Sequence, residues 1–381
     1  MYKQIKYFKG LNALRFFAAY LVVLHHAEQI RLKNDIFNLK SFSLFNNGGL
    51  AVTFFFVLSG FLISYLLLKE LKQTNKVSIK KFYTRRILRI WPLYFLLVII
   101  GTLIVPYFLS IINHAYEMPY RFQDVILYYV FFSPFMVNVL FGHHLLEPLW
   151  SIGVEELFYI IWAPLFNFLK NHILKIILTI IILKVSILSM LHADIFQLSP
   201  IIVQVIGLLQ FEAMAIGGFV AYLLYHRKKN IESSFIFSRP VEITLISFIL
   251  LRIVADRFLS EKSLIFEHLF HTPVASSIII MMCFAWLIVN ISVNRKAVIK
   301  LNNKLFNFLG DISYGIYMYH LLIVFGIILF LKKYLATMPD FVGTIFFYLV
   351  LTSVVILISF LSKTFFEGYF LKIKGRFRDN K

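Results

Sequence analysis

Two ionisable residues, Arg15 and His26, lie within an apolar stretch that runs from Leu11 to Ala27. Ionisable side chains are costly inside a membrane span and therefore indicate a functional site. Eleven residues of α-helix advance about 16 Å and close to three turns, so the two side chains share one face near opposite ends of the segment. An imidazole is the usual general base for a hydroxyl nucleophile, which makes His26 a candidate catalytic base. The alternative is that both side chains simply reach the two membrane interfaces.

A basic block precedes the third apolar run, and two of its arginines are three residues apart. Arg86 and Arg89 therefore lie on one helical face, where the run begins. Planar guanidinium groups suit a phosphate or pyrophosphate. We predict a phosphate-binding role for this pair, whereas the neighbouring lysines are explained by membrane topology alone.

The stretch Trp150 to Tyr159, WSIGVEELFY, contains a candidate carboxylate. Helical spacing places Ser151, Glu155 and Tyr159 on one stripe, so Glu155 is expected to face the interior of a helical bundle. A carboxylate next to a histidine fixes the tautomer of the ring and stabilises its protonated form. We expect Glu155 to orient His26, and the alternative is a structural carboxylate paired with a base or a peptide group.

A further polar face lies between Gly310 and His320. Ser313, Tyr317 and His320 follow i, i+4, i+7 spacing, and hydrogen bonds between helices are the more favoured role for each. We predict no metal site and no tightly bound cofactor.

The composition specifies the kind of molecule that must position these residues. The chain has 60% hydrophobic and only 15% charged residues, too little polar surface for a soluble globule of 381 residues. Its net charge of +19 comes from short basic clusters between apolar runs, a pattern of membrane topology, so we do not expect nucleic-acid binding. The prediction is an all-α, polytopic membrane helical bundle in contact with lipids.

About ten apolar segments are long enough to cross a bilayer, and they form one domain over 1–381. Most Lys and Arg residues fall in alternate loops if the N- and C-termini are cytoplasmic, with tails at 1–10 and 363–381. The stretch 125–140 is apolar, but Ser133 and Pro134 interrupt it, so we predict an interfacial or re-entrant piece. The predicted spans are 11–28, 49–68, 90–108, 148–168, 174–192, 199–225, 240–258, 272–292, 308–331 and 341–362.

These stretches together, in this order, resemble the motifs of the acyltransferase-3 family of integral-membrane acyltransferases. The resemblance is to a stand-alone membrane domain without the esterase-like domain that some members append. The matching residues are Arg15 and His26; FFVLSGFLI at Phe55 to Ile63, with Ser59, Gly60 and Phe61 at its centre; Arg86 and Arg89, followed by Pro92; Trp150 to Tyr159, including Ser151 and Glu155; and Ser313 to His320, including Tyr317.

The resemblance implies transfer of an acyl group, usually acetyl, from cytoplasmic acyl-coenzyme A to a hydroxyl of a cell-envelope carbohydrate. Lipopolysaccharide, capsule, exopolysaccharide and lipid-linked sugar precursors are the acceptor classes, and a bacterial inner membrane is the expected location. In this reading Arg86 and Arg89 bind the phosphates of the coenzyme, and Arg15 guides its pantetheine arm or the carbonyl oxygen. His26 either deprotonates the acceptor hydroxyl or carries the acyl group transiently.

Two other functions are weighed against this one. Bundles with buried charges also serve transport, so a transporter or flippase for polyprenyl-linked saccharides is the alternative. The absence of inverted-repeat symmetry and of paired, interrupted helices argues against it. An inactive relative that serves as an assembly subunit is disfavoured by the intact Arg15, His26 and arginine pair. The sequence carries no signal for an oligomeric state.

Overall fold

The computed structural model describes residues 8–112, 118–227, 231–375 and 377. Within these ranges the chain is helical and contains no strand, which confirms the predicted all-α class. Parts of the predicted tails, residues 1–7, 376 and 378–381, lie outside the described residues.

The helices follow one another with short connections. The first half contains α1 (Leu11–Lys33), η1 (Ser43–Asn46), α2 (Gly48–Thr74), α3 (Ile79–Ile99), the π-helix η2 (Ile100–Ile104), α4 (Val105–Ile111), α5 (Phe122–Val130), α6 (Pro134–Phe141), α7 (Leu149–Phe168), η3 (Lys170–His172) and α8 (Ile173–His192). The second half contains α9 (Pro200–Leu208), α10 (Phe211–His226), η4 (Ile231–Ser233), η5 (Phe235–Phe237), α11 (Arg239–Val254), α12 (Asp256–Lys262), α13 (Leu264–His271), α14 (Ala275–Val293), α15 (Lys304–Asp311), α16 (Ser313–Thr337), α17 (Asp340–Leu361), the π-helix η6 (Ser362–Glu367) and α18 (Gly368–Gly375).

Eight helical stretches of the described chain are long and apolar enough to cross a membrane, as expected for a multi-pass membrane protein. Two of the predicted spans are not among them. Helix α1 carries several charged residues, and α11 has only 16 residues, so the total of about ten remains a prediction. The eight stretches are Gly48–Thr74, Ile79–Ile111, Leu149–Phe168, Lys170–His192, Pro200–His226, Ala275–Val293, Ser313–Thr337 and Asp340–Gly375.

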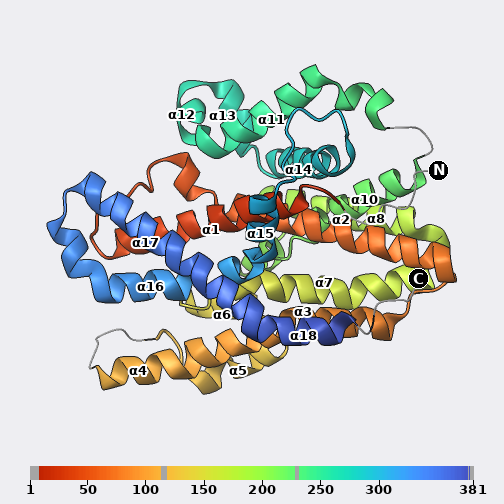
Figure 1. Ribbon diagram of the computed structural model, residues 1–381. Coiled ribbons are helices and arrows are strands. Elements are labelled where there is room, and N and C mark those ends of the chain that lie inside the picture. The colour runs from red at the N-terminus through yellow and green to blue at the C-terminus, as the bar shows by residue number, and fades with distance from the viewer. Residues whose placement is uncertain (1–7, 113–117, 228–230, 376, 378–381) are drawn as a thin grey trace.

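The long helices run roughly along one direction and turn at two ends of the bundle (Figure 1). The turn between α2 and α3 lies at one end, on the right of the view, and the turn between α16 and α17 lies at the other, on the left. We call these the α2–α3 end and the α16–α17 end. Residues 363–375, which belong to the predicted C-terminal tail, continue the last helix through η6 and α18.

Helices α2 and α10 cross at very short range, because each presents a glycine to the backbone of the other. A Cβ atom at Gly60 would lie 1.9 Å from the carbonyl oxygen of Met214, and one at Gly217 would lie 2.0 Å from that of Val57. Only small residues permit such an approach of two helix backbones within a membrane. This crossing fixes the rotation of α2 and therefore the direction of Ser59, the residue before Gly60.

The stretch 125–140 forms two short helices, α5 and α6, joined by a turn at Phe131 to Ser133. The ring of Phe132 stacks on Tyr94, with 4.8 Å between ring centroids, and lies as close to Trp91. Tyr94 also donates its hydroxyl hydrogen to the carbonyl oxygen of Tyr129, at 3.0 Å. Neither helix is long enough to cross a bilayer, so the pair packs on α3 without adding a span.

Candidate active site

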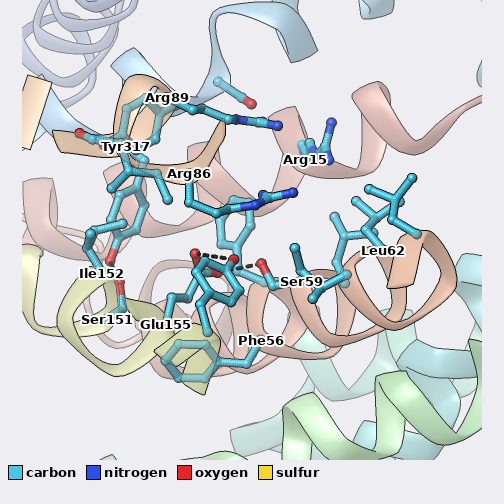
Figure 2. A pocket seen from close by; sticks show the side chains of 18 residues that line it. Arg15, Phe56, Ser59, Leu62, Arg86, Arg89, Ser151, Ile152, Glu155 and Tyr317 are labelled. Carbon is cyan, nitrogen blue, oxygen red and sulfur yellow. Dashed lines mark hydrogen bonds between the residues drawn. The ribbon is translucent and has the colours of Figure 1, made fainter. Parts of the chain in front are cut away.

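A cavity of about 250 Å³ opens between α1, α2, α3, α7 and α16 (Figure 2). Five separate helices supply its walls, so the site exists only when the bundle is assembled. Most of the residues that the sequence singles out are brought together here. Its lining comprises Arg15, Phe55, Phe56, Leu58, Ser59, Leu62, Ile63, Leu66, Arg86, Arg89, Ile90, Ser151, Ile152, Glu155, Tyr159, Ser313, Tyr314 and Tyr317.

Three arginines give the cavity its electrostatic character. Arg15 comes from α1, whereas Arg86 and Arg89 come from α3, and Figure 2 shows all three on the same side of the cavity. Arg15 donates to the side chain of Asn12 at 3.3 Å, and the guanidinium group of Arg86 lies over the ring of Tyr159, 5.4 Å from its centroid. None of the three forms an ion pair with a described acidic side chain. The cavity is therefore suited to an anion.

One of these three arginines, Arg86, has a hydrogen-bond donor that no described residue uses. The Nε atom of Arg86 is buried and has no hydrogen-bond partner among the residues that the structure describes. A buried donor without a partner costs free energy, which a bound acceptor such as a phosphate oxygen would recover. This atom makes Arg86 the arginine with the clearest need for a ligand.

Glu155 lies in the same cavity, opposite the arginines. Its carboxylate accepts hydrogen bonds from the hydroxyl of Ser59 at 2.5 Å and from that of Tyr159 at 3.1 Å. These contacts join α2 to α7 across the floor of the cavity. The stripe spacing correctly indicated that Glu155 faces the interior, and Tyr159 belongs to the same stripe.

The expected contact between Glu155 and His26 is wrong. Helices α3 and α7 run antiparallel, since Tyr83 donates to the carbonyl oxygen of Ile160 at 2.8 Å and Trp91 donates to Glu156 at 3.1 Å. This register places the part of α7 around Glu155 and Glu156 beside the middle of α3. Glu155 therefore lies at the level of the arginines.

The partner of His26 is His320 on α16. Their Nδ1 and Nε2 atoms, respectively, are 2.9 Å apart, and their rings stack with centroids 5.0 Å apart. His26 is 8% exposed and His320 is completely buried. The sequence placed His320 on a polar helix face but did not connect it with His26.

The tautomers of this pair follow from one further contact. His320 Nδ1 lies 2.5 Å from the carbonyl oxygen of Tyr317, which can only accept, so Nδ1 carries the hydrogen. In the neutral ring His320 Nε2 is then an acceptor, and the hydrogen in its bond to His26 belongs to His26 Nδ1. His26 Nε2 therefore keeps a free lone pair and can act as a base or nucleophile.

Tyr317 connects the histidine pair with the arginine cavity. Its carbonyl oxygen holds His320, while its ring lines the cavity and its hydroxyl lies 2.8 Å from that of Ser151 and donates to the carbonyl oxygen of Pro148 at 3.0 Å. Ser313, one turn earlier on α16, lines the cavity and donates to the carbonyl oxygen of Gly310 at 2.7 Å.

Besides His320, three of the supporting residues predicted from the sequence do not line the cavity. Gly60 serves the crossing of α2 with α10, and Phe61 is completely buried against Phe8, with ring centroids 5.1 Å apart. The ring of Trp150 packs edge-on against Phe56, which does line the cavity. These residues position the wall and do not contact its contents.

Comparisons with known proteins agree with this architecture. A family model described as an acyltransferase domain matches residues 8–363. A Staphylococcus aureus (strain COL) protein named "Putative O-acetyltransferase" is 31% identical over 167 residues, which are 42% of this chain and 24% of that protein. The peptidoglycan O-acetyltransferase of Listeria monocytogenes is 29% identical over 174 residues, 43% of this chain and 25% of the relative. The matches thus span about a quarter of the length of these relatives. No solved structure matches the chain.

Proposed function

The chain belongs to the acyltransferase family whose model it matches, and we propose that it is an O-acetyltransferase that moves an acetyl group from acyl-coenzyme A to a hydroxyl of a cell-envelope carbohydrate in a bacterial membrane. The observation that supports this most directly is the cavity with three arginines that lack carboxylate partners in the described chain. A coenzyme donor carries several phosphate groups, which such a set of cations would bind.

In this proposal the donor enters from the α2–α3 end. Arg86 and Arg89 lie two to three turns from the start of α3, about 10 to 15 Å along its axis, and bind the phosphate oxygens of the donor at that depth. The pantetheine arm then lies along the apolar wall formed by Phe55 and Leu62. Arg15, on α1, donates to the carbonyl oxygen of the thioester, where negative charge develops during attack.

Acyl transfer then uses the lone pair of His26. His26 Nε2 accepts the proton of the acceptor hydroxyl while the hydroxyl oxygen attacks the thioester carbonyl carbon. The coenzyme thiolate leaves and takes up that proton. A relay in which His26 Nε2 carries the acetyl group before the acceptor arrives would use the same lone pair. In both routes Glu155 holds Ser59 and Tyr159 in place and partly balances the three guanidinium charges.

Purified protein in lipid nanodiscs tests the proposal. We expect transfer of radiolabelled acetyl from acetyl-coenzyme A to at least one acceptor in a panel of peptidoglycan fragments, capsular oligosaccharides and lipid-linked sugars. The release of free coenzyme A is followed in parallel. Absence of both labelled glycan and coenzyme A release with every acceptor would overturn the proposal. Movement of an unmodified lipid-linked saccharide across the membrane would support transport instead.

Substitution of Arg86 or Arg89 by glutamine is expected to weaken donor binding specifically. Loss of one charged hydrogen-bonding group should raise KM for acetyl-coenzyme A by about tenfold to a hundredfold and leave KM for the acceptor unchanged. Arg85→Gln is the matched control, because Arg85 is in the same helix but contacts Glu70 at 3.4 Å, and it should leave both constants unchanged. Weaker acceptor binding alone in the Arg86 and Arg89 variants would contradict the assignment.

A further inference from the structure

A second, larger cavity of about 780 Å³ is lined by α1, the loop 142–148 and α16. The ends of α1 and α16 that contribute to it lie at the α16–α17 end of the bundle (Figure 1). Gln29 and Ile30, three and four residues after His26, belong to its wall and share the helical face of His26. On α16 the wall includes Leu321, which follows His320. This cleft therefore begins about one helical turn beyond the histidine pair, on the side away from the arginine cavity. We call it the α1–α16 cleft.

The polar side chains of the α1–α16 cleft form a short hydrogen-bonded row. Gln29 Nε2 lies 3.5 Å from His143 Nε2, and His143 Nδ1 donates to the carboxylate of Glu147 at 2.8 Å. The side chain of His143 is 54% exposed and that of Glu147 is 19% exposed, so both can be reached from the cleft. An amide, an imidazole and a carboxylate are groups that bind sugar hydroxyls by donating and accepting hydrogen bonds.

The loop that presents these groups is itself fixed. His144 donates from Nε2 to the side-chain oxygen of Asn138 at 2.8 Å, and its Nδ1 accepts from the amide of Leu146 at 3.1 Å. Burial lowers the pKa of His144 to about 3, so the ring stays neutral and both contacts persist near neutral pH. The neighbouring His143 and Glu147 are thereby held at the edge of the cleft.

Three lysines add a positive rim. Lys33 lies at the end of α1, and Lys332 and Lys333 lie near the end of α16. Lys332 donates to the side-chain oxygen of Asn34 at 3.5 Å, and none of the three forms an ion pair with an acidic group in the described ranges. The one carboxylate in the wall, Glu147, is already bound to His143. The cleft therefore has an excess of positive charge where it opens.

We propose that the α1–α16 cleft is the acceptor site and that it selects a carbohydrate bearing a carboxylate or phosphate group, an inference that rests on the proposed function. Lys33 follows His26 by seven residues, which places its Cα about 10 Å further along α1. The anionic group of the acceptor, bound at Lys33, therefore lies about the length of one or two sugar rings from the hydroxyl that approaches His26 Nε2. The cavity volume falls within the range of small-ligand sites, about 300 to 1,000 Å³.

Binding of matched probes to the full chain in detergent micelles tests this inference. The probes are a galacturonic acid trisaccharide, which carries carboxylates, and its methyl ester, which has the same skeleton without the charges. We expect the acid to bind at least about tenfold more tightly than the ester at low salt, and we expect the difference to shrink at high salt. The triple variant Lys33→Gln, Lys332→Gln, Lys333→Gln should bind both probes equally.

Two controls separate this inference from the proposed function. Lys262→Gln removes an exposed lysine of α12 outside the cleft and should keep the preference for the acid. His26→Ala should keep the preference for the acid over the ester, since it changes the reacting group and not the lysines at the rim of the cleft. Equal binding of acid and ester by the wild type, or a preference that persists in the triple variant, overturns the anionic acceptor site. Acetyl transfer to a neutral glycan would in that case still support the proposed function.

Discussion

Replacement of His26 by alanine is expected to lower kcat for acetyl transfer by about a thousandfold, the middle of the range for loss of a general base. The reason is the free lone pair on Nε2, which the contact between Nδ1 and His320 leaves available. KM for acetyl-coenzyme A should change little, because His26 does not line the arginine cavity. Steady-state transfer of radiolabelled acetyl to the best acceptor measures both constants.

The neighbouring histidine provides the matched control. His25 packs against Gly48, and a Cβ atom there would lie 2.5 Å from the His25 ring, so this side chain serves the contact between α1 and α2. His25→Ala should therefore retain most of the activity, with at most a lower thermal stability. A greater loss of kcat in His25→Ala than in His26→Ala would show that the wrong ring had been assigned as the base.

The sequence predicted the fold class well because the membrane imposes a strong pattern. Long apolar runs can only be helices inside a bilayer, so most spans follow from hydropathy. The sequence did not indicate how far the last helix extends, because hydropathy marks where the chain leaves the apolar layer and not where the helix ends. Residues 363–375 stay helical beyond that point.

The sequence predicted only part of the site, because helical phase indicates which residues face inward but not which residues of two neighbouring helices lie at the same height. Helical phase correctly selected the inward-facing residues, and Arg15, Arg86 and Arg89 meet with Glu155 in one cavity. Phase does not specify the vertical register between helices, which here depends on contacts such as Tyr83 with Ile160. Glu155 was therefore assigned to the wrong partner. Neither Asn12, which binds Arg15, nor the row from Gln29 to Glu147 formed a motif that the sequence alone would indicate.

Replacement of His320 by leucine is expected to lower kcat by about a hundredfold without changing KM for either substrate. Leucine cannot accept the hydrogen of His26 Nδ1, so this buried group loses the acceptor that His320 provides. The His26 ring can then shift its hydrogen to Nε2, the atom that must act as the base, or rotate away from the acceptor. Control of tautomer and orientation in a catalytic histidine is worth several orders of magnitude in rate.

His320→Gln separates this positioning role from packing. A glutamine side chain reaches a similar distance and can place its amide oxygen where Nε2 of His320 stands, so it should keep kcat within about tenfold of the wild type. Nitrogen NMR of histidine-labelled protein provides a readout that packing alone would not change, because it reports which ring nitrogen of His26 carries the hydrogen. We expect Nδ1 to be protonated in the wild type and in His320→Gln, and a mixture of tautomers in His320→Leu. If both variants lose activity equally while His26 keeps its tautomer, then His320 supports only the packing of α1 on α16, and the lone pair of His26 must be fixed by another contact.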